Sequence, residues 1–501
     1  MAYTKQQRRR IWLKILASVA MFAVVFSYLN LVFRPKYTVN STGKGASPTT
    51  TMHKGFYALP KNAIDVLFVG TSETYTGVNP LLIWKEAGIR SHVFGAPTQR
   101  MFIQQFFLRE AFKRQSPSHV FFDVSRFFAK DDVGAYMFWI NIGDIPPSFD
   151  KLRLILRQAA RGKGYGLSFV VPLPKYHDRW DGGLTAEDFQ IPLKWDNRDY
   201  LHGHSPLYIT RPVELKYNAP EKDVRMPKEN IGLFKEMKAM CEEKGAQMVL
   251  FKPPTGDNWN RDRSAYLTNF AQEHGVPFYD FFLNMEEIGL ELNGDYQRSM
   301  HLNYSGSAKF TKFMIPILTD ELHIKGSVDE KEAEQWADDY SKYQRQVKGY
   351  ELTLCKDLPS FLAAAQDENY TLFFAACGAA GLGMDDAAKE LLKETGLRHE
   401  FGKTEAEQGA AYLAVVENGK LQFERQDKTA PLTYAEDHGS RRVVIKSAGV
   451  KSGGGISMAV GSELHTERLN QVGLHIFVYD KVLEQVVDHV RYYAPENRLY
   501  R

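Results

Sequence analysis

The chain has little cysteine and no excess of charge of one sign. Its three cysteines, Cys241, Cys355 and Cys377, are widely spaced along 501 residues, which excludes a disulfide framework and a zinc-binding cysteine motif. The 63 basic and 60 acidic residues nearly cancel to a net charge of +3, so nothing indicates nucleic-acid binding. We expect no metal, cofactor or nucleic-acid partner. The length predicts more than one domain, and the 44% apolar content is enough for sizeable cores.

One long run near the N-terminus lacks charge altogether. Residues 15–33 are uncharged, and this length fits a membrane-spanning helix. The basic cluster in residues 5–10 outweighs Arg34 and Lys36, so we expect a cytoplasmic N-terminus and an extracellular body. A cleaved signal peptide is the alternative, but its apolar region would be shorter and followed by small residues. We therefore expect a cytoplasmic tail (1–10), a single-pass membrane anchor (11–33) and a linker (34–54).

The next part, residues 55–325, alternates short apolar runs with helical patterns. This alternation predicts an α/β domain with a doubly wound parallel sheet and helices on both faces. Residues 125–225, rich in aromatic residues, Gly and Pro, break the alternation and are interpreted as an insertion. The expected strands are Asp65–Val69, His119–Asp123, Gln247–Phe251 and Val276–Asp280, and the expected helices are Thr98–Arg114, Lys228–Lys244 and Arg263–His274.

Ser72 follows the first of these strands. The strand has no polar alternation, as is typical of a strand covered on both faces, and Gly70 permits a sharp turn at its carboxyl end. Open α/β sheets place their ligands at this edge. Ser72 is therefore a candidate nucleophile, although Thr71 and Ser72 could instead only cap the next helix.

His301 is the candidate base for that serine. A serine hydroxyl needs a positioned base to become a good nucleophile, and histidine is the usual one. His301 precedes Ser305-Gly306 and an amphipathic run, so we expect it in a loop that enters a helix. A histidine that only caps or packs locally is the alternative.

These motifs resemble the SGNH (GDSL-type) hydrolases, and within them the DltD-like and alginate-acetylation-like proteins. The matching segments are Gly70–Glu73, Phe94–Gln99, Pro117–Asp123 and His301–Gly306. The resemblance implies a flavodoxin-like three-layer fold with Ser72 as nucleophile and His301 as base. It also implies an oxyanion hole that includes the N–H groups of Ser72 and Gly95, and substrate contacts from Gln99 and Asn303.

Two positions depart from the family pattern. The aspartate that orients the histidine usually stands three residues before it, where this chain has Arg298. An arginine cannot accept the imidazole N–H, and its charge opposes the imidazolium formed in catalysis. Asp295 is the nearest carboxylate, so either it substitutes, or the site works as a dyad, or it is inactive. The asparagine that normally completes the oxyanion hole has no counterpart in residues 122–126.

The insertion holds a possible sugar-binding set. Residues 176–180 read Tyr-His-Asp-Arg-Trp, and His177, Arg179 and Trp180 combine an aromatic face with polar groups that suit sugar hydroxyls. A similar His-x-Arg-Trp pattern occurs in bacterial relatives of the family. An ordered loop anchored by Trp180 is an equally good interpretation.

The remainder differs in character. Residues 326–348 are rich in charge and predict a solvated linker or an exposed helix. Residues 349–501 predict a β-rich α+β domain with a hairpin turn at Asn418-Gly419. Segments such as Phe373–Gly378 and Gly473–Asp480 resemble the interleukin-like EMT inducer (PANDER-like) domain, which implies binding of a carbohydrate or a surface partner without catalysis. A β-domain that serves only stability or dimer contacts is the alternative.

The leading hypothesis is a membrane-anchored enzyme that transfers or removes acyl groups, most simply acetyl, on a cell-surface polysaccharide of a bacterial envelope. By resemblance, its partner is a membrane-bound O-acyltransferase that brings acyl groups across the membrane. A degenerate SGNH domain that serves as a glycan-binding or assembly scaffold is the main competitor. An extracellular esterase with no membrane partner is the third possibility.

Overall fold

The computed structural model divides the chain into two compact units, Met1–Tyr340 and Ser341–Arg501. It describes residues 4–33, 48–130, 132–162, 173–181, 184, 186–189, 198–214, 219–256, 259–297, 301–327, 330–378, 380–402, 409–461, 463–469 and 472–501. The division falls inside helix α12 (Glu330–Leu354), so the charged segment expected as linker or exposed helix is helical from residue 330.

The first unit is built on a parallel sheet with the strand order β2-β1-β3-β4-β5. This is the flavodoxin-like order, in which the chain reverses direction across the sheet between β1 and β3. The four predicted strands are present, and β2 was missed because Val93 is the only apolar residue among its three. The strands are β1 (Val66–Val69), β2 (Ser91–Val93), β3 (His119–Asp123), β4 (Gln247–Lys252) and β5 (Phe278–Asp280).

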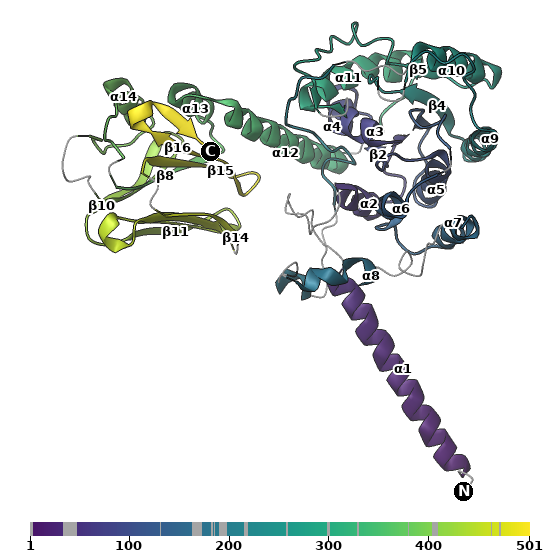
Figure 1. Cartoon of the computed structure of the whole chain (residues 1–501), viewed down its shortest axis with the longest axis horizontal. Helices are drawn as coiled ribbons and strands as arrows, with labels where there is room; N and C mark the ends of the chain where they lie inside the picture. Colours follow the sequence, from purple (N-terminus) through teal and green to yellow (C-terminus); the bar gives the residue numbers. More distant parts are fainter. Residues whose placement is uncertain are drawn as a thin grey trace. The chain divides into compact units, whose positions relative to one another are not determined.

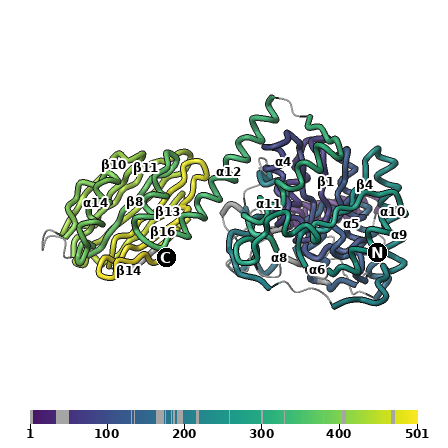
Figure 2. The backbone as a smooth tube through the Cα atoms, turned by 90° about the horizontal axis from the view of Figure 1, so that it is seen from above, coloured from purple at the N-terminus to yellow at the C-terminus, as the bar shows by residue number. Residues whose placement is uncertain are grey.

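Helices cover both faces of this sheet (Figures 1 and 2), as the alternating pattern predicted. Successive residues of β1 point to opposite faces, so Leu67 and Val69 join one core while Val66 and Phe68 join the other. The first core includes α5 (Met101–Phe112), α6 (Ala135–Ile142), α7 (Phe149–Ala160), α9 (Lys228–Glu243) and α10 (Arg261–Glu273). The second includes α3 (Ser72–Gly77), α4 (Pro80–Ala87) and α11 (Tyr304–Pro316).

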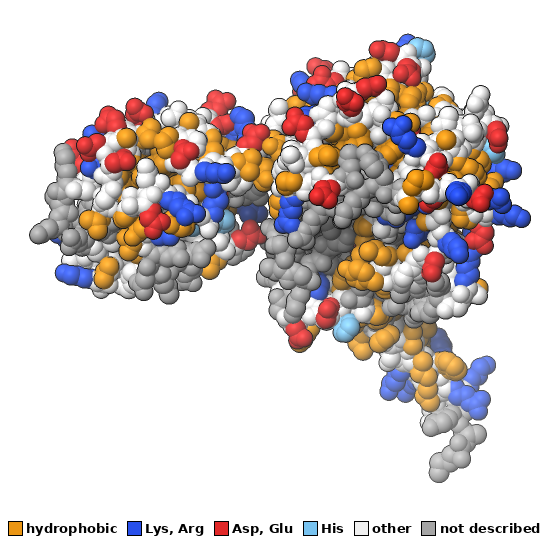
Figure 3. Space-filling model, turned by 45° about the horizontal axis from the view of Figure 1, so that its top comes forward, with side chains coloured by type: hydrophobic (Ala, Val, Ile, Leu, Met, Phe, Trp, Pro, Cys, Tyr) orange, Lys and Arg blue, Asp and Glu red, His pale blue; other side chains and the backbone are white. Residues whose placement is uncertain are grey.

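The N-terminal helix α1 (Lys5–Phe33) is long and apolar enough to cross a membrane, and its side chains are largely exposed. Figure 3 shows hydrophobic side chains along this projecting helix and basic ones toward its outer end. Helix α2 (Pro48–Ala58) begins inside the segment expected as linker, and its Met52, His53 and Phe56 are buried. Apolar residues four apart in this short sequence place one side of α2 in the core, so the folded unit begins before residue 55.

The second unit consists of two antiparallel sheets with helices on one side. The six-stranded sheet has the order β10-β9-β8-β15-β16-β17, and the four-stranded sheet has the order β11-β12-β13-β14. Residues such as Phe373, Val415 and Ile445 pack between the sheets, whereas α13 (Leu358–Ala364) and α14 (Asp386–Glu394) cover the outer face of the larger sheet.

The strand bounds of the second unit agree with the β-rich prediction. Asn418 and Gly419 both have positive φ and close the β9–β10 hairpin, as their sequence predicted. The strands are β8 (Tyr370–Cys377), β9 (Ala411–Glu417), β10 (Lys420–Asp427), β11 (Leu432–His438), β12 (Arg441–Ala448), β13 (Gly455–Val460), β14 (Glu463–Leu469), β15 (Leu474–Asp480), β16 (Gln485–Tyr493) and β17 (Arg498–Tyr500).

Candidate active site

Residues 70–74, here called the nucleophile turn, join the carboxyl end of β1 to helix α3. Thr71 is the N-cap of that helix, and its side chain accepts from the Glu73 N–H, so Ser72 is the first helical residue. A Cβ at position 70 would lie 2.2 Å from Thr74 Oγ1 and 2.5 Å from the Asp123 Cβ. Only glycine fits there, and the turn can therefore pack directly against β3.

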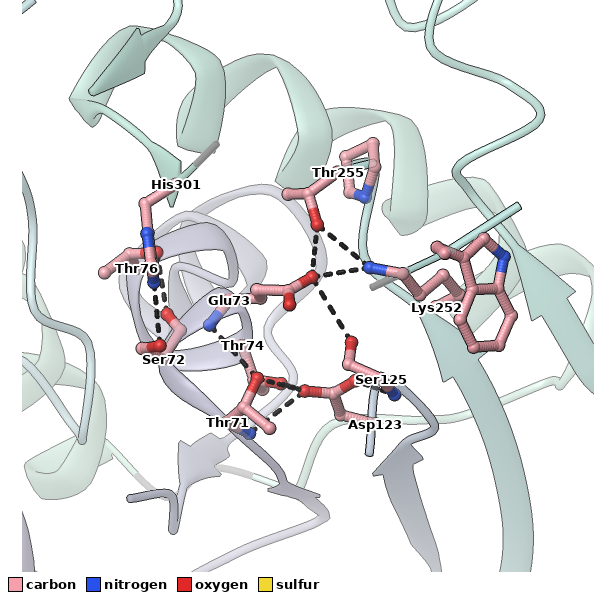
Figure 4. A network of polar contacts seen from close by, with 12 residues as sticks. Thr71, Ser72, Glu73, Thr74, Thr76, Asp123, Ser125, Lys252, Thr255 and His301 are labelled. Atoms are coloured by element: carbon pink, nitrogen blue, oxygen red, sulfur yellow. Dashed lines mark hydrogen bonds and ion pairs between the residues drawn. The ribbon is translucent and has the colours of Figure 1, made fainter. Parts of the chain in front are cut away.

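Asp123, the last residue of β3, holds this turn in place (Figure 4). Its Oδ2 accepts from the Thr71 N–H at 3.0 Å, from Thr71 Oγ1 at 2.6 Å and from Thr74 Oγ1 at 3.0 Å. The carboxylate is fully buried, and buried acceptors of several donors fix geometry strongly. The sequence identified residues 117–123 as a motif but assigned Asp123 no role.

Ser72 and His301 meet at this edge of the sheet. The Ser72 Oγ and the His301 Nε2 are hydrogen-bonded at 2.7 Å, and both residues are half-buried. His301 lies in the two-residue strand β7 (His301–Leu302), which pairs with β6 (Tyr296–Gln297) immediately before α11. A nucleophile and a base in direct contact, with access to solvent, are what acyl transfer by serine requires.

The N–H groups of Ser72 and Gly95 make no hydrogen bond within the described part of the chain. Gly95 follows β2, and a Cβ there would lie 2.9 Å from the Gly70 carbonyl oxygen, so a larger residue would push this loop from the nucleophile turn. The Gly95 carbonyl accepts from His53 Nε2 at 2.9 Å. Two free donors beside a serine have the chemistry of an oxyanion hole.

Asp295 is buried, and its carboxylate is bonded to groups other than His301. It accepts from Ser305 Oγ at 2.8 Å, from the Glu291 N–H at 2.8 Å and from Lys309 Nζ at 2.7 Å. Its part as the orienting acid therefore stays a prediction that these bonds do not support. Arg298 lies outside the described residues.

Asn303 is the N-cap of α11, and its expected contact with substrate stays a prediction that its bonds do not support. Its Oδ1 accepts from the N–H groups of Ser305 and Gly306, and its Nδ2 donates to Thr210 Oγ1 and the Gly294 carbonyl. An amide with both ends bonded in the interior has no group left for a ligand. Gln99, by contrast, is fully buried, and its amide has no hydrogen-bond partner among the described residues.

The set expected to bind sugar lies at the end of α1. Arg179 is buried, where it donates to the Phe33 carbonyl at 2.9 Å and pairs with Asp188 at 2.8 Å. His177 is exposed and bonds the Pro174 carbonyl, and Trp180 is exposed. The guanidinium thus fastens the insertion to the last turn of α1, and a role in sugar recognition for this set stays a prediction that these contacts do not support.

Two features of the site were missed by the sequence prediction. Glu73 is buried beside Ser72, where its Oε2 accepts from Lys252 Nζ at 2.5 Å, from Ser125 Oγ at 3.2 Å and from Thr255 Oγ1 (Figure 4). Lys252 has no exposed surface. Nothing in the sequence shows that Glu73 pairs with a lysine 179 residues away.

Tyr75 is the second missed feature. Burial raises the pKa of Tyr75 to about 12, although its hydrogen bond with Ser72 opposes the rise, so the hydroxyl is protonated at neutral pH. Its hydroxyl can therefore donate a hydrogen bond next to the nucleophile. Tyr75 lies in α3, two residues after the motif Gly70–Glu73 that identified Ser72.

Two solved structures are similar to part of the chain. One is a proposed acylhydrolase from Bacteroides fragilis, with 13% identity and a TM-score of 0.27 over 54% of this chain and 95% of that one. The other is a GDSL-like lipase from Bacteroides thetaiotaomicron, with 10% identity and a TM-score of 0.27 over 55% of this chain and 100% of that one. No protein-family model and no curated protein matches the chain. The residues around Ser72 therefore carry the functional proposal.

Proposed function

We propose that the chain is an SGNH-type O-acyltransferase or esterase, anchored in the membrane, that acts on acyl groups, most simply acetyl, of a cell-surface polysaccharide. The observation that carries the proposal is the 2.7 Å contact between Ser72 Oγ and His301 Nε2 at the carboxyl edge of a parallel sheet. This edge is where such sheets bind their ligands.

The proposed reaction has two halves. Ser72 Oγ attacks the ester carbonyl while His301 Nε2 takes its proton, and the N–H groups of Ser72 and Gly95 receive the oxyanion, each worth about 3 kcal/mol in such sites. The tetrahedral intermediate collapses, His301 returns the proton to the leaving alcohol, and the acyl group stays on Ser72. A sugar hydroxyl, or water in hydrolysis, then repeats the sequence and frees the serine.

Tyr75 supplies what the family pattern lacks in this chain. The oxyanion hole has no asparagine in residues 122–126, and the protonated Tyr75 hydroxyl lies beside Ser72. We assign it the third donor to the oxyanion. A phenol is a suitable donor for this purpose.

The remaining parts serve delivery of the substrate. Helix α1 is the anchor with its N-terminus in the cytoplasm, as the basic cluster before it favours. A multi-spanning O-acyltransferase is the proposed source of acyl groups, and the second unit is proposed to hold the polymer.

The experiment uses the full chain in lipid nanodiscs, with a radiolabelled acetyl ester as donor and de-acetylated envelope polysaccharide as acceptor. We expect label on the polysaccharide, an acetylated Ser72 peptide when acceptor is withheld, and neither product with Ser72→Ala. Release of free acetate without labelled polysaccharide would support the plain esterase. Neither product from a folded chain would contradict the proposal.

One observation favours the scaffold alternative. The bonds of Asp295 go to Ser305, Glu291 and Lys309, so His301 has no orienting carboxylate from that residue. A degenerate domain would bind the polysaccharide with the same affinity in the wild type and in Ser72→Ala, and would form no acetylated Ser72 peptide.

A further inference from the structure

Helix α7 presents an apolar line to the outside of the first unit. Phe149, Leu152 and Leu156 are 91%, 41% and 59% exposed, and their spacing puts them on one side of the helix. The opposite side is also apolar, because Leu154 and Ile155 are buried in the core. Ser148 caps the helix by accepting from the Lys151 N–H, and the outer apolar line has no cover among the described residues.

Two basic side chains lie beside this apolar line, and the neighbouring acid, Asp150, is already paired. Arg153 and Arg157 are exposed and form no ion pair within the described residues. Asp150 pairs with Lys113 at 2.6 Å. Lys151 is buried and donates to the Ile145 carbonyl at 2.6 Å. The outer face of α7 therefore combines exposed hydrocarbon with unpaired positive charge, the pattern of a helix that lies in a membrane interface.

A second group of exposed aromatic side chains lies at the end of α1. Trp180 is 73% exposed and Phe189 is 48% exposed. They belong to the 3₁₀ turns His177–Trp180 and Ala186–Phe189. Arg179 of the first turn donates both to the Phe33 carbonyl and to Asp188 of the second. Tyr28 Oη donates to the Phe189 carbonyl at 3.0 Å. Aromatic residues gather where membrane helices leave the bilayer, and Phe33 is the last residue of the apolar helix.

Tyr176 connects the two groups. Its ring packs with Val32 and Phe33, and its hydroxyl donates to Asp144 at 3.1 Å, between α6 and α7. Figure 1 shows α6, α7 and the turn after α8 (Leu173–Tyr176) on the side of the first unit from which α1 projects. The end of the apolar helix and the aromatic turns are thus connected to the segment between α6 and α7.

We propose that the outer face of α7 and the turns carrying Trp180 and Phe189 form one membrane-contact surface whose occupant is the outer leaflet with its anionic headgroups. The apolar line enters the acyl boundary, and Arg153 and Arg157 bind lipid phosphates. The surface rests on the proposed function in one respect, since it requires α1 in the membrane. If this surface binds the bilayer, the first unit lies against the membrane and is not connected to it by α1 alone.

The experiment measures depth in lipid nanodiscs with the full chain. Cys355 is half-buried and could react with the label, so it is replaced by serine. Cys241 and Cys377 are buried and are kept. A bimane label is attached to Phe149→Cys or Leu156→Cys, and Leu283→Cys, exposed after β5, is the matched control. Phe22→Cys in α1 tests the anchor separately. Quenching by brominated lipid is compared with quenching by aqueous iodide.

Labels at 149 and 156 are expected to be quenched by brominated lipid and protected from iodide, whereas the label at 283 should behave in the opposite way. Quenching at 22 together with iodide-accessible labels at 149 and 156 would overturn the contact surface and leave the anchor standing. An iodide-accessible label at 22 would overturn both.

Charge reversal tests the role of the arginines. Arg153→Glu and Arg157→Glu should each weaken the docked state about five-fold in discs with phosphatidylglycerol and much less in discs of phosphatidylcholine alone. Circular dichroism confirms that the variants are folded. Equal effects in both lipids, or no effect in either, would overturn the assignment of phosphate binding.

Discussion

The nucleophile turn and the β6–β7 hairpin meet at one hydrogen bond but are held in different ways. The turn is fixed by two buried carboxylates, Asp123 from β3 and Glu73 within α3, which accept bonds from the surrounding structure. The hairpin is fixed by Asp295, which bonds residues of α11 and the preceding segment. The position of Ser72 is therefore part of the fold, whereas the described bonds of Asp295 anchor the loop of His301 and not its imidazole.

This difference indicates that the β6–β7 hairpin tolerates substitution better than the nucleophile turn does. A carboxylate that satisfies buried donors cannot be lost without leaving them unpaired, which costs about 1–3 kcal/mol for each. The bonds of Asp295, by contrast, can be weakened while His301 on the β6–β7 hairpin still reaches Ser72. The predictions below separate these two cases.

The largest effect is expected for the nucleophile itself. Ser72→Ala removes the acyl acceptor and should lower kcat/KM for an acetyl ester by about 10⁴-fold or more. Ester hydrolysis by the full chain in nanodiscs measures it. Ser118→Ala is the matched control, since Ser118 stands at the amino end of β3 and its hydroxyl bonds the Asp65 carbonyl and His119, away from Ser72. Equal loss in both variants would place catalysis elsewhere.

The next effect concerns the buried ion pair of the nucleophile turn. Lys252→Met leaves the Glu73 carboxylate buried without its cation and should destabilise the first unit by about 3–5 kcal/mol. Adding Glu73→Gln should recover part of that loss, because no uncompensated charge remains. Urea unfolding followed by circular dichroism measures both. Lys238→Met, which breaks the exposed pair with Glu242, should cost about 0.5 kcal/mol, and a similar cost for Lys252→Met would refute a structural role for the buried pair.

A smaller effect is expected for Asp123→Asn, which changes one hydrogen bond of the nucleophile turn. Asp123→Asn can keep an oxygen toward Thr71 and Thr74, but its amide then faces the Ser125 N–H that now donates to Oδ1. We expect a loss of about 1–3 kcal/mol in stability and about ten-fold in kcat/KM as the turn shifts. An Asp123→Asn variant with unchanged stability and activity would show that the turn is held without this carboxylate.

The smallest effect on chemistry is expected for Asp295. Asp295→Asn should lower stability by about 1 kcal/mol through its bonds to Lys309 and Ser305, while kcat/KM stays within about ten-fold of the wild type. An orienting aspartate would instead cost about 10⁴-fold. The same hydrolysis assay decides between the two, and the larger loss would restore Asp295 to the acid role.

Much of the fold followed from local pattern. The apolar runs at β1, β3 and β4 predicted strands almost to the residue, because strands buried on both faces show no polar alternation. Strand β2 was missed because His92 interrupts its three residues. Helix α2 was missed because its Thr-rich start resembles a linker, and only contact with the core reveals it.

In the candidate site as well, the residues that local sequence pattern indicates were predicted, and those that depend on distant contacts were not. Ser72 was predicted because a glycine and a serine after a buried strand have a local geometric meaning, and His301 because a serine needs a base. Gly95 was expected only from the family resemblance. The role of Asn303 was assigned from a family motif, whereas the cap it forms depends on where α11 begins. Arg179 and Lys252 could not be placed from sequence, since their partners lie 146 and 179 residues away.

The most direct test of the Ser72–His301 pair is covalent labelling with a fluorophosphonate. The full chain in nanodiscs is treated with the probe, and the modified peptide is identified by mass spectrometry in the wild type and in His301→Ala. The account predicts a label on Ser72 in the wild type and none in His301→Ala at the same exposure. An unlabelled Ser72 in the folded wild type, or labelling that persists at the same rate without His301, would contradict it.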